Sequence, residues 1–264
     1  MNLKTRKFNS VYLIIGVIAV FIFAFSGYSS YKTAKVGNSY KIINIFPHDK
    51  TAFTQGLEFN DGYLYESTGL YGRSSIRKVD IKTAKILKLK TLSSNYFGEG
   101  ITILNNRIFQ LTWQSRTGFI YNKDTFDMIG SFNYRTQGWG LTNNKKELIY
   151  SDGSSKLYFM DPENFKILKI LNVSDKEGKA VRNLNELEYI NGKVYANIWR
   201  SDKIVAINPV TGIVEKWIDL ADLRSKLPSH HKVDVLNGIA YNPENNTFYI
   251  TGKYWSNLFQ IEIN

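Results

Sequence analysis

One carboxylate and two sets of polar and aromatic residues recur at matched positions along this chain. Glu99 stands just ahead of a strand-like segment, and aligning similar segments gives the equivalent residues Gln55, Trp139, Asn185 and Asn237. The second set ends the following strand-like segments: Gly69, Trp113, Ser154, Trp199 and Lys253. A carboxylate among tryptophans is partly removed from water, which raises its pKa and suits it to proton transfer. Nearby amide and ammonium groups can stabilise an oxyanion.

These positions belong to five repeats, each predicted to begin with a β-hairpin. Residues 100–113 form two strand-like segments around the turn Asn105-Asn106, and residues 56–69, 140–154, 186–199 and 238–253 repeat the pattern. The first set of positions is spaced by 44, 40, 46 and 52 residues. A period of roughly 40–50 residues with a few strands each is typical of a β-propeller. The sequence therefore predicts an all-β fold, a five-bladed β-propeller over residues 39–264, with both sets at one rim of its channel.

The two ends of this propeller are expected to meet. The last repeat stops after its third strand, at Asn264, and residues 39–47 alternate as a strand before the first repeat. Because an open sheet edge exposes unpaired backbone groups, we expect the N-terminal strand to become the outer strand of the last blade. Residues 220–235 break the period and predict an extra loop with a short helix.

Composition excludes several classes of protein and site. Hydrophobic residues at 43% and aromatic residues at 14% exclude a disordered chain. The absence of cysteine excludes disulfides, thiolate metal sites and thiol catalysis. His48, His230 and His231 share no spacing, which argues against a histidine zinc site. The net charge of +11 falls to +8 without Lys4, Arg6 and Lys7, and the other cations are scattered, so no nucleic-acid binding is predicted.

The first 27 residues are typical of an export signal. A basic stretch precedes an apolar run over residues 11–25, which predicts a signal peptide or, if it stays uncleaved, an N-terminal membrane anchor. Residues 28–38 are expected to be a linker. The sequence therefore predicts an exported, monomeric protein. It is expected to be periplasmic or extracellular, or to be tethered to the outer face of the cytoplasmic membrane by that segment.

Several spaced motifs resemble one known family. They are residues 53–57 (Phe-Thr-Gln-Gly-Leu), 66–75, 97–100 (Phe-Gly-Glu-Gly), 137–141 (Gln-Gly-Trp-Gly-Leu), 184–188, 197–199 and 234–240. Together they resemble the plant and bacterial glutaminyl-peptide cyclotransferases of the papaya type over essentially all of residues 39–264. The resemblance implies a five-bladed propeller that cyclises N-terminal glutamine of peptides or proteins to pyroglutamate and releases ammonia, without a metal or other cofactor.

The same resemblance implies roles for nine residues. Glu99 matches the family's catalytic acid and base. The matching substrate-pocket residues are Phe53, Gln55, Phe97, Trp113, Trp139, Asn185, Trp199 and Lys253. Structural roles are the simpler interpretation of Asn237 and Glu186, and Arg73 and Arg77 are interpreted as hydrogen-bonding between blades.

Two other functions fit the residues alone. A calcium-dependent lactonase or esterase could use Glu99, Asn185 and Asn237 as oxygen ligands, although the tryptophans and Lys253 suit a cation site poorly. A non-enzymatic propeller could use the tryptophans as a ligand cage. Sensitivity to a chelator identifies the first, and the absence of any turnover identifies the second.

Overall fold

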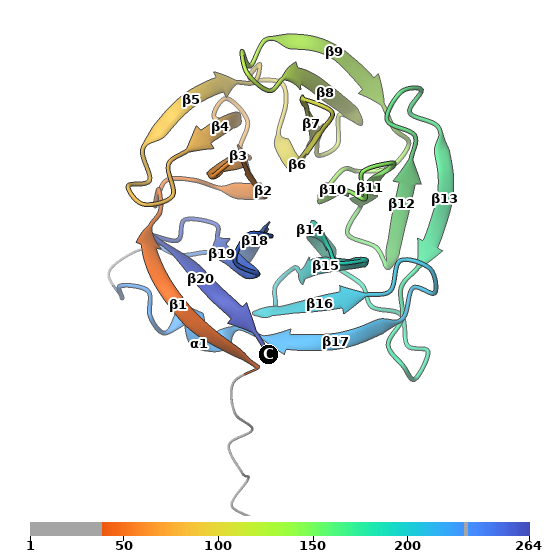
Figure 1. Ribbon diagram of the computed structural model, residues 1–264. Helices are drawn as coiled ribbons and strands as arrows, with labels where there is room; N and C mark the ends of the chain where they lie inside the picture. The colour runs from red at the N-terminus through yellow and green to blue at the C-terminus, as the bar shows by residue number, and fades with distance from the viewer. Residues whose placement is uncertain (1–38, 230–231) are drawn as a thin grey trace, which may run out of the picture. The chain divides into compact units, whose positions relative to one another are not determined.

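The computed structural model describes residues 39–229 and 232–264 of the chain. Over these residues the strands form five four-stranded antiparallel sheets arranged as blades around a central channel (Figure 1). This confirms the predicted five-bladed β-propeller. The predicted signal or anchor over residues 1–27 and the predicted linker over residues 28–38 lie outside the described residues.

In the first four blades, consecutive strands run outward from the channel. Blade 1 contains β2 (Thr54–Asn60), β3 (Tyr63–Thr68), β4 (Ser75–Val79) and β5 (Ile86–Thr91). Blade 2 contains β6 (Gly98–Leu104), β7 (Arg107–Thr112), β8 (Thr117–Asn122) and β9 (Met128–Asn133). Blade 3 contains β10 (Leu141–Asn143), β11 (Leu148–Ser151), β12 (Lys156–Met160) and β13 (Ile167–Asn172). Blade 4 contains β14 (Leu184–Ile190), β15 (Lys193–Ile198), β16 (Lys203–Ile207) and β17 (Val214–Asp219).

Blade 5 joins the two ends of the propeller. It contains β18 (Leu236–Asn242), β19 (Thr247–Gly252), β20 (Asn257–Ile263) and, as its outer strand, β1 (Tyr40–Pro47). β1 pairs antiparallel with β20 from Tyr40 opposite Ile263 to Pro47 opposite Asn257, as the sequence predicts. The outer edge of β20 is therefore covered, and the chain crosses from β1 to the innermost strand of blade 1.

Local sequence explains the inner hairpins. Asn105 and Asn106 have φ values of 52° and 60°, the left-handed conformation that a two-residue hairpin turn requires and that asparagine tolerates. Asn191 and Gly192, at 48° and 82°, make the same kind of turn in blade 4. Apolar clusters fill the spaces between blades, as where Phe109 of blade 2 packs with Tyr150 of blade 3.

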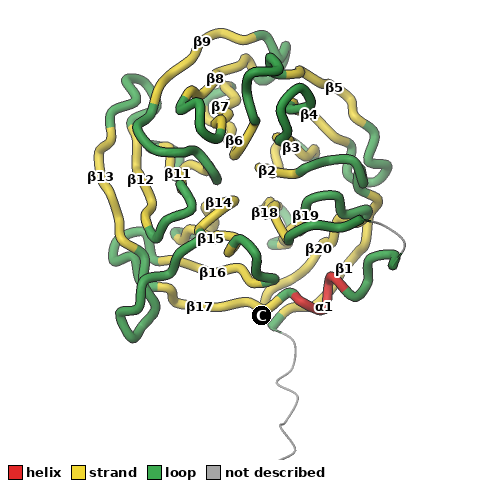
Figure 2. Tube along the Cα trace, turned by 180° about the vertical axis from the view of Figure 1, so that it is seen from behind, coloured by secondary structure: helices red, strands yellow, loops and turns green. Residues whose placement is uncertain are grey.

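The predicted insertion does contain a short helix, α1 (Ala221–Arg224). Leu220 and Leu223 are fully buried in the cluster that includes Tyr40 of β1 and Phe259 of β20, so α1 covers the outer side of blade 5 beside β1 (Figure 2). Within the described residues, no helix is long and apolar enough to cross a membrane.

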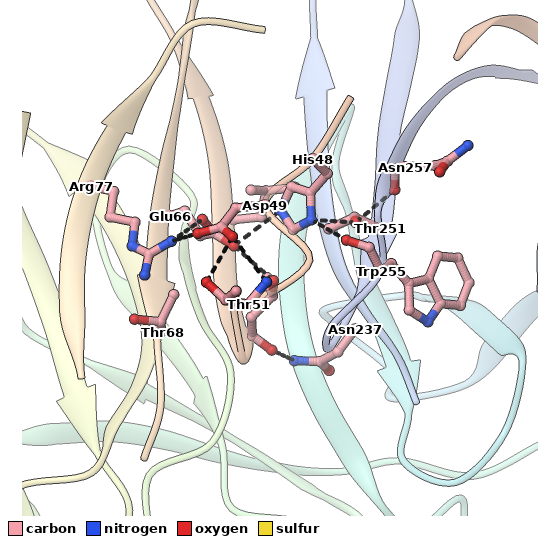
Figure 3. Close-up of polar contacts among 12 residues, drawn as sticks. His48, Asp49, Thr51, Glu66, Thr68, Arg77, Asn237, Thr251, Trp255 and Asn257 are labelled. Carbon is pink, nitrogen blue, oxygen red and sulfur yellow. Dashed lines mark hydrogen bonds and ion pairs between the residues drawn. The ribbon is translucent and has the colours of Figure 1, made fainter. Parts of the chain in front are cut away.

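A network of charged side chains links the two ends of the propeller (Figure 3). His48, just after β1, lies 3.2 Å through Nε2 from Glu66 Oε1 of blade 1, and its Nδ1 lies 2.8 Å from the Trp255 carbonyl oxygen of blade 5. Arg77 donates to Asp49 Oδ2 at 2.8 Å and lies 3.8 Å from Glu66. We call His48, Asp49, Glu66 and Arg77 the closure network, because it connects the β1–β2 crossover to both neighbouring blades.

Opposite pKa shifts make the closure network most stabilising at mildly acidic pH. Burial alone would lower the pKa of His48, but the Glu66 charge and hydrogen bond raise it. Burial alone would raise the pKa of Glu66, but His48 and Arg77 hold it below its usual value. The Glu66 contribution is present above about pH 4.5 and is lost as pH falls through the folded-state pKa. The His48 contribution is complete below about pH 6.5 and is lost as pH rises through its raised pKa.

We therefore expect Glu66→Gln to destabilise the protein by about 1.5–3 kcal/mol, the range for hydrogen bonds to charged groups. Chemical unfolding at several pH values measures this. The difference from wild type is expected to be largest between about pH 4.5 and 6.5 and to shrink on either side. Glu244→Gln, in an exposed turn, serves as the control. A difference that does not vary with pH would contradict the assigned ion pairs.

Candidate active site

The channel mouth at the start of the first strands holds a pocket of about 380 Å³. All nine residues predicted for the site line it: Phe53, Gln55, Phe97, Glu99, Trp113, Trp139, Asn185, Trp199 and Lys253. They come from all five blades. Arg200, Asp234 and Val235 complete the lining and were not predicted.

Bulges in the innermost strands direct the first set of residues. The pairing register between the first two strands of a blade shifts around Gln55, Glu99, Asn185 and Asn237. A bulge inserts an unpaired residue and turns its side chain, a device that often occurs beside functional sites. All five residues of the first set were predicted to lie just before the first strand of their blade. Gln55, Glu99, Asn185 and Asn237 instead lie inside that strand, because pairing continues beyond the bulge. Only Trp139 precedes its strand.

Glycine lets the innermost strands approach one another closely behind these residues. A Cβ atom at Gly100 would lie 2.4 Å from the Leu141 backbone nitrogen, and one at Gly140 would lie 2.0 Å from the Asn185 carbonyl oxygen. Blade 4 has Glu186 at this position, and its carboxylate accepts hydrogen bonds from the backbone of blades 1 and 5, at Leu57 and Ile239. The structural role predicted for Glu186 is therefore confirmed.

Residues of the second set follow directly after the second strand in four blades, rather than ending it as predicted. Trp113 donates its backbone N–H to Phe97 O at 3.0 Å, and Trp199 donates to Asn183 O at 2.9 Å. Lys253 donates to Val235 O at 3.0 Å. These bonds fix the backbone below each pocket side chain. Ser154 of blade 3 lies three residues beyond β11 and does not line the pocket.

Glu99 is 4% exposed and accepts a hydrogen bond from one amide side chain, which a second amide orients. Gln55 Nε2 donates to Glu99 Oε1 at 2.9 Å. Asn237 Nδ2 donates to the Thr54 carbonyl oxygen at 3.0 Å and lies 3.4 Å from Gln55 Oε1. Asn237 thus orients Gln55, which orients the carboxylate, in agreement with the structural role predicted for Asn237.

Burial sets the protonation of the pocket's charged groups. Removal from water raises the pKa of Glu99 well above its usual value, and the Lys253 charge opposes this rise. Burial lowers the pKa of Lys253, which is 5% exposed, against the attraction of Glu99 and Asp234. The Lys253 ammonium also lies 4.6 Å from the centre of the Phe53 ring. A carboxyl group with a raised pKa can both accept and return a proton near neutral pH.

Aromatic rings form two walls of the pocket. Phe97 and Trp113 have ring centres 5.7 Å apart, and Trp139 meets Trp199 nearly at right angles at 5.4 Å. Gln137 connects the walls, since its side-chain oxygen accepts from Trp113 Nε1 at 2.7 Å and from Trp139 Nε1 at 3.2 Å.

We expect Gln137→Ala to raise KM about 3–10-fold by releasing both indoles, because a hydrogen bond contributes about 0.5–1.5 kcal/mol. Steady-state kinetics with a peptide carrying N-terminal glutamine, the substrate that the motif resemblance implies, measures this effect. Gln114→Ala, an exposed neighbour of Trp113 that does not line the pocket, is the matched control. An unchanged KM in Gln137→Ala would show that the indoles are held by packing alone.

Asn185 carries a buried hydrogen-bonding atom that has no partner in the described part of the chain. The residue is 2% exposed and lines the pocket, and its side-chain oxygen has no hydrogen-bond partner among the described residues. A buried polar group without a partner is unfavourable, so this oxygen is an exception to the hydrogen bonding that buried polar groups usually have.

The three lining residues that the sequence reasoning missed lie outside the two aligned sets. Arg200 follows Trp199 and places its guanidinium 4.3 Å from that ring. Asp234 and Val235 precede β18, and their backbone pairs with Lys253. Asp234 and Val235 belong to the motif over residues 234–240, so their closeness in sequence to Asn237 is the feature that could have predicted them. No group of three or more His, Cys, Asp or Glu side chains among the described residues is placed to hold a metal ion.

The fold and pocket define a class of protein: a five-bladed β-propeller whose channel mouth surrounds a buried carboxylate with aromatic rings. A sequence profile for glutamine cyclotransferases matches residues 17–263. A glutaminyl-peptide cyclotransferase of Arabidopsis thaliana is 42% identical over 260 residues, which cover 95% of this chain and 81% of that protein. The crystal structure of Myxococcus xanthus glutaminyl cyclase superposes with a TM-score of 0.79 at 34% identity, covering 84% of this chain and 95% of that one.

The chain therefore belongs to the glutamine cyclotransferase family, which confirms the resemblance seen in its motifs.

Proposed function

We propose that this protein is a glutaminyl-peptide cyclotransferase, which converts N-terminal glutamine to pyroglutamate with release of ammonia. Family membership supports the activity, and one observation supports the chemistry: Glu99 is a buried carboxylate with a raised pKa inside the aromatic pocket. The substrates are peptides or proteins whose first residue is glutamine.

The first step needs a base. A free α-amine has a pKa of about 7.7–8.0, so much of it is protonated at neutral pH and cannot attack. In the proposed mechanism Glu99 accepts this proton, and the amine nitrogen then attacks the carbonyl carbon of its own γ-amide. The carbon–nitrogen bond of the ring forms as the carbonyl π electrons move onto oxygen.

The second step needs an acid and an oxyanion partner. Protonated Glu99 returns its proton to the γ-nitrogen, the oxyanion electrons re-form the carbonyl bond, the bond from carbon to that nitrogen breaks, and ammonia leaves. The ring nitrogen carries an extra proton after the attack and gives it to the Glu99 carboxylate. The departing ammonia takes this proton as ammonium, so the product is the neutral lactam and the carboxylate is restored. Lys253 is the cation available to stabilise the transient oxyanion, because it is buried in the same pocket. Asn185 lines the same pocket, so its side-chain amide is a candidate contact for the substrate.

The aromatic walls contribute by restricting the substrate. The apolar surfaces of Trp113, Trp139 and Trp199 suit the methylene groups of a glutamine side chain. When that side chain is held folded, the amine lies close to the amide carbon. This conformation is rare in the free substrate, and binding selects it. The same walls exclude water from Glu99 and so maintain its raised pKa.

We further propose that the reaction needs no metal ion and that residues 1–27 direct export. The mechanism above assigns every proton transfer to Glu99, so a metal-activated water is not required. The basic and apolar stretches of residues 1–25 support export. Fractionation of cells that express the full chain would detect export.

Ammonia release from a short peptide with N-terminal glutamine tests the proposed function. We expect release by the purified protein, equal rates with and without a chelator, and a pyroglutamyl product in mass spectrometry. Release that stops with a chelator and returns with calcium would contradict metal independence, and no release at all would contradict the function.

A further inference from the structure

A second hollow lies beside the pocket on the same face of the propeller. It has a volume of about 300 Å³ and is lined by Lys50, Thr51, Arg73, Lys232 and Tyr254. These residues come from the β1–β2 crossover, the loop after β3, the segment before β18 and the β19–β20 turn. All four segments lie at the end of the blades where the pocket opens. We call this hollow the basic groove.

The basic groove and the pocket share a wall. Tyr254 follows the pocket residue Lys253 in the chain, and its ring centre lies 5.3 Å from that of the pocket residue Phe53. The Tyr254 backbone N–H donates to the Ala52 carbonyl oxygen at 2.8 Å, which ties the β19–β20 turn to the crossover. A peptide that leaves the pocket across Phe53 and Tyr254 therefore enters the basic groove.

No ion pair among the described residues neutralises the positive charges of the basic groove. Lys50, Arg73 and Lys232 are exposed, and none of them forms an ion pair within residues 39–229 and 232–264. The nearby carboxylate of Asp49 is bound by Arg77. Arg73 was interpreted from sequence as a blade-to-blade hydrogen-bonding residue, but its side chain makes no such bond in the described residues. Three cations around one hollow attract anionic groups.

We propose that the basic groove binds acidic side chains of the substrate, so that the preferred peptides carry Asp or Glu about two to four residues after the glutamine. This inference rests on the proposed function. The glutamine occupies the pocket, so the rest of the peptide must leave over its rim. Because an extended residue spans about 3.4 Å, the next few residues reach the groove.

The expected preference is moderate and depends on salt. Exposed ion pairs are individually weak, but several cations together speed the encounter with an anionic peptide, and added salt screens them. We expect kcat/KM for a peptide with glutamate at positions 3–5 to exceed that for the matching neutral peptide, with alanine at those positions, about 3–10-fold at low ionic strength. Both peptides start with glutamine. At about 1 M salt the ratio is expected to approach one.

Reversing single charges of the basic groove tests whether the groove causes the preference for acidic peptides. Arg73→Glu and Lys232→Glu are each expected to lower the acidic-to-neutral ratio of kcat/KM about threefold or more, with unchanged thermal unfolding because both side chains are exposed. Lys146→Glu, an exposed lysine in the β10–β11 turn at the other end of the channel, is the matched control and should keep the wild-type ratio.

The outcomes separate this inference from the proposed function. Turnover of both peptides at equal rates would overturn the acidic preference and leave the cyclase intact. A preference removed by Arg200→Glu but kept in Arg73→Glu and Lys232→Glu would place the peptide over blade 4, which also overturns the inference. Turnover of neither peptide would overturn both proposals.

Discussion

Replacing Glu99 by glutamine is expected to lower kcat at least about 10³-fold while the protein stays folded. General acid–base catalysis alone contributes about 10²–10⁴-fold, and here one residue carries out both proton transfers. The glutamine oxygen can still accept the hydrogen bond from Gln55, so the geometry of the pocket is retained. Ammonia release measures the loss, and Glu177→Gln, in an exposed loop, is the control.

The same substitution should make the protein more stable than wild type, by an amount that grows as pH rises. Burial raises the pKa of Glu99, so between about pH 4.5 and that raised value the unfolded state releases a proton that the folded state keeps. Wild-type stability falls through this window, whereas glutamine does not titrate. We expect equal melting temperatures near pH 4.5 and a higher one for Glu99→Gln toward neutral pH. Equal melting temperatures across this range would contradict a raised pKa.

Replacing Lys253 by methionine is expected to lower kcat about 10²-fold and to move the acidic limb of the pH profile upward. Loss of a single oxyanion donor typically lowers kcat about 10²–10³-fold. The Lys253 charge opposes the burial effect on Glu99, so its removal raises the pKa of that carboxyl further. The base then becomes available only at higher pH.

The pH profile of kcat/KM distinguishes this role from a structural one. Methionine fills a similar volume, so packing against Phe53 is largely kept. The substrate amine titrates identically with both enzymes, so a shifted acidic limb belongs to the protein. Lys146→Met, an exposed lysine, should leave the limb in place. An unshifted limb in Lys253→Met would show that Lys253 does not act on Glu99.

The fold was predictable because its repeats are visible in the sequence. The turn Asn105-Asn106 and its counterparts mark each inner hairpin, and the missing fourth strand after β20 predicts that β1 closes the ring. The bulges in the innermost strands could not be predicted from the repeat pattern. A bulge depends on which residues pair across two strands, and a single sequence does not show this pairing, so Glu99 was placed before β6 although it lies inside it.

The site residues that occupy equivalent positions in the repeats were predicted correctly to lie together. Alignment of the blades brought Glu99, Trp139 and Asn185 to one position, and the structure places all three around one pocket. Asp234 and Arg200 depend on loops that differ between blades, so no alignment of repeats could place them. The roles of Gln137 and Arg73 depend on side-chain partners, or on the lack of them, which a single sequence does not reveal.

The pH dependence of pyroglutamate formation by wild type and Glu99→Gln, with a chelator present, tests the central claim most directly. The proposal predicts turnover by wild type with an acidic limb from a carboxyl titrating above 4.5, the usual value for a glutamate carboxyl. The residual activity of the variant is expected to keep only the limb of the substrate amine, whose pKa is about 7.7–8.0. Wild-type activity retained in Glu99→Gln would contradict the assignment of Glu99 as the proton carrier.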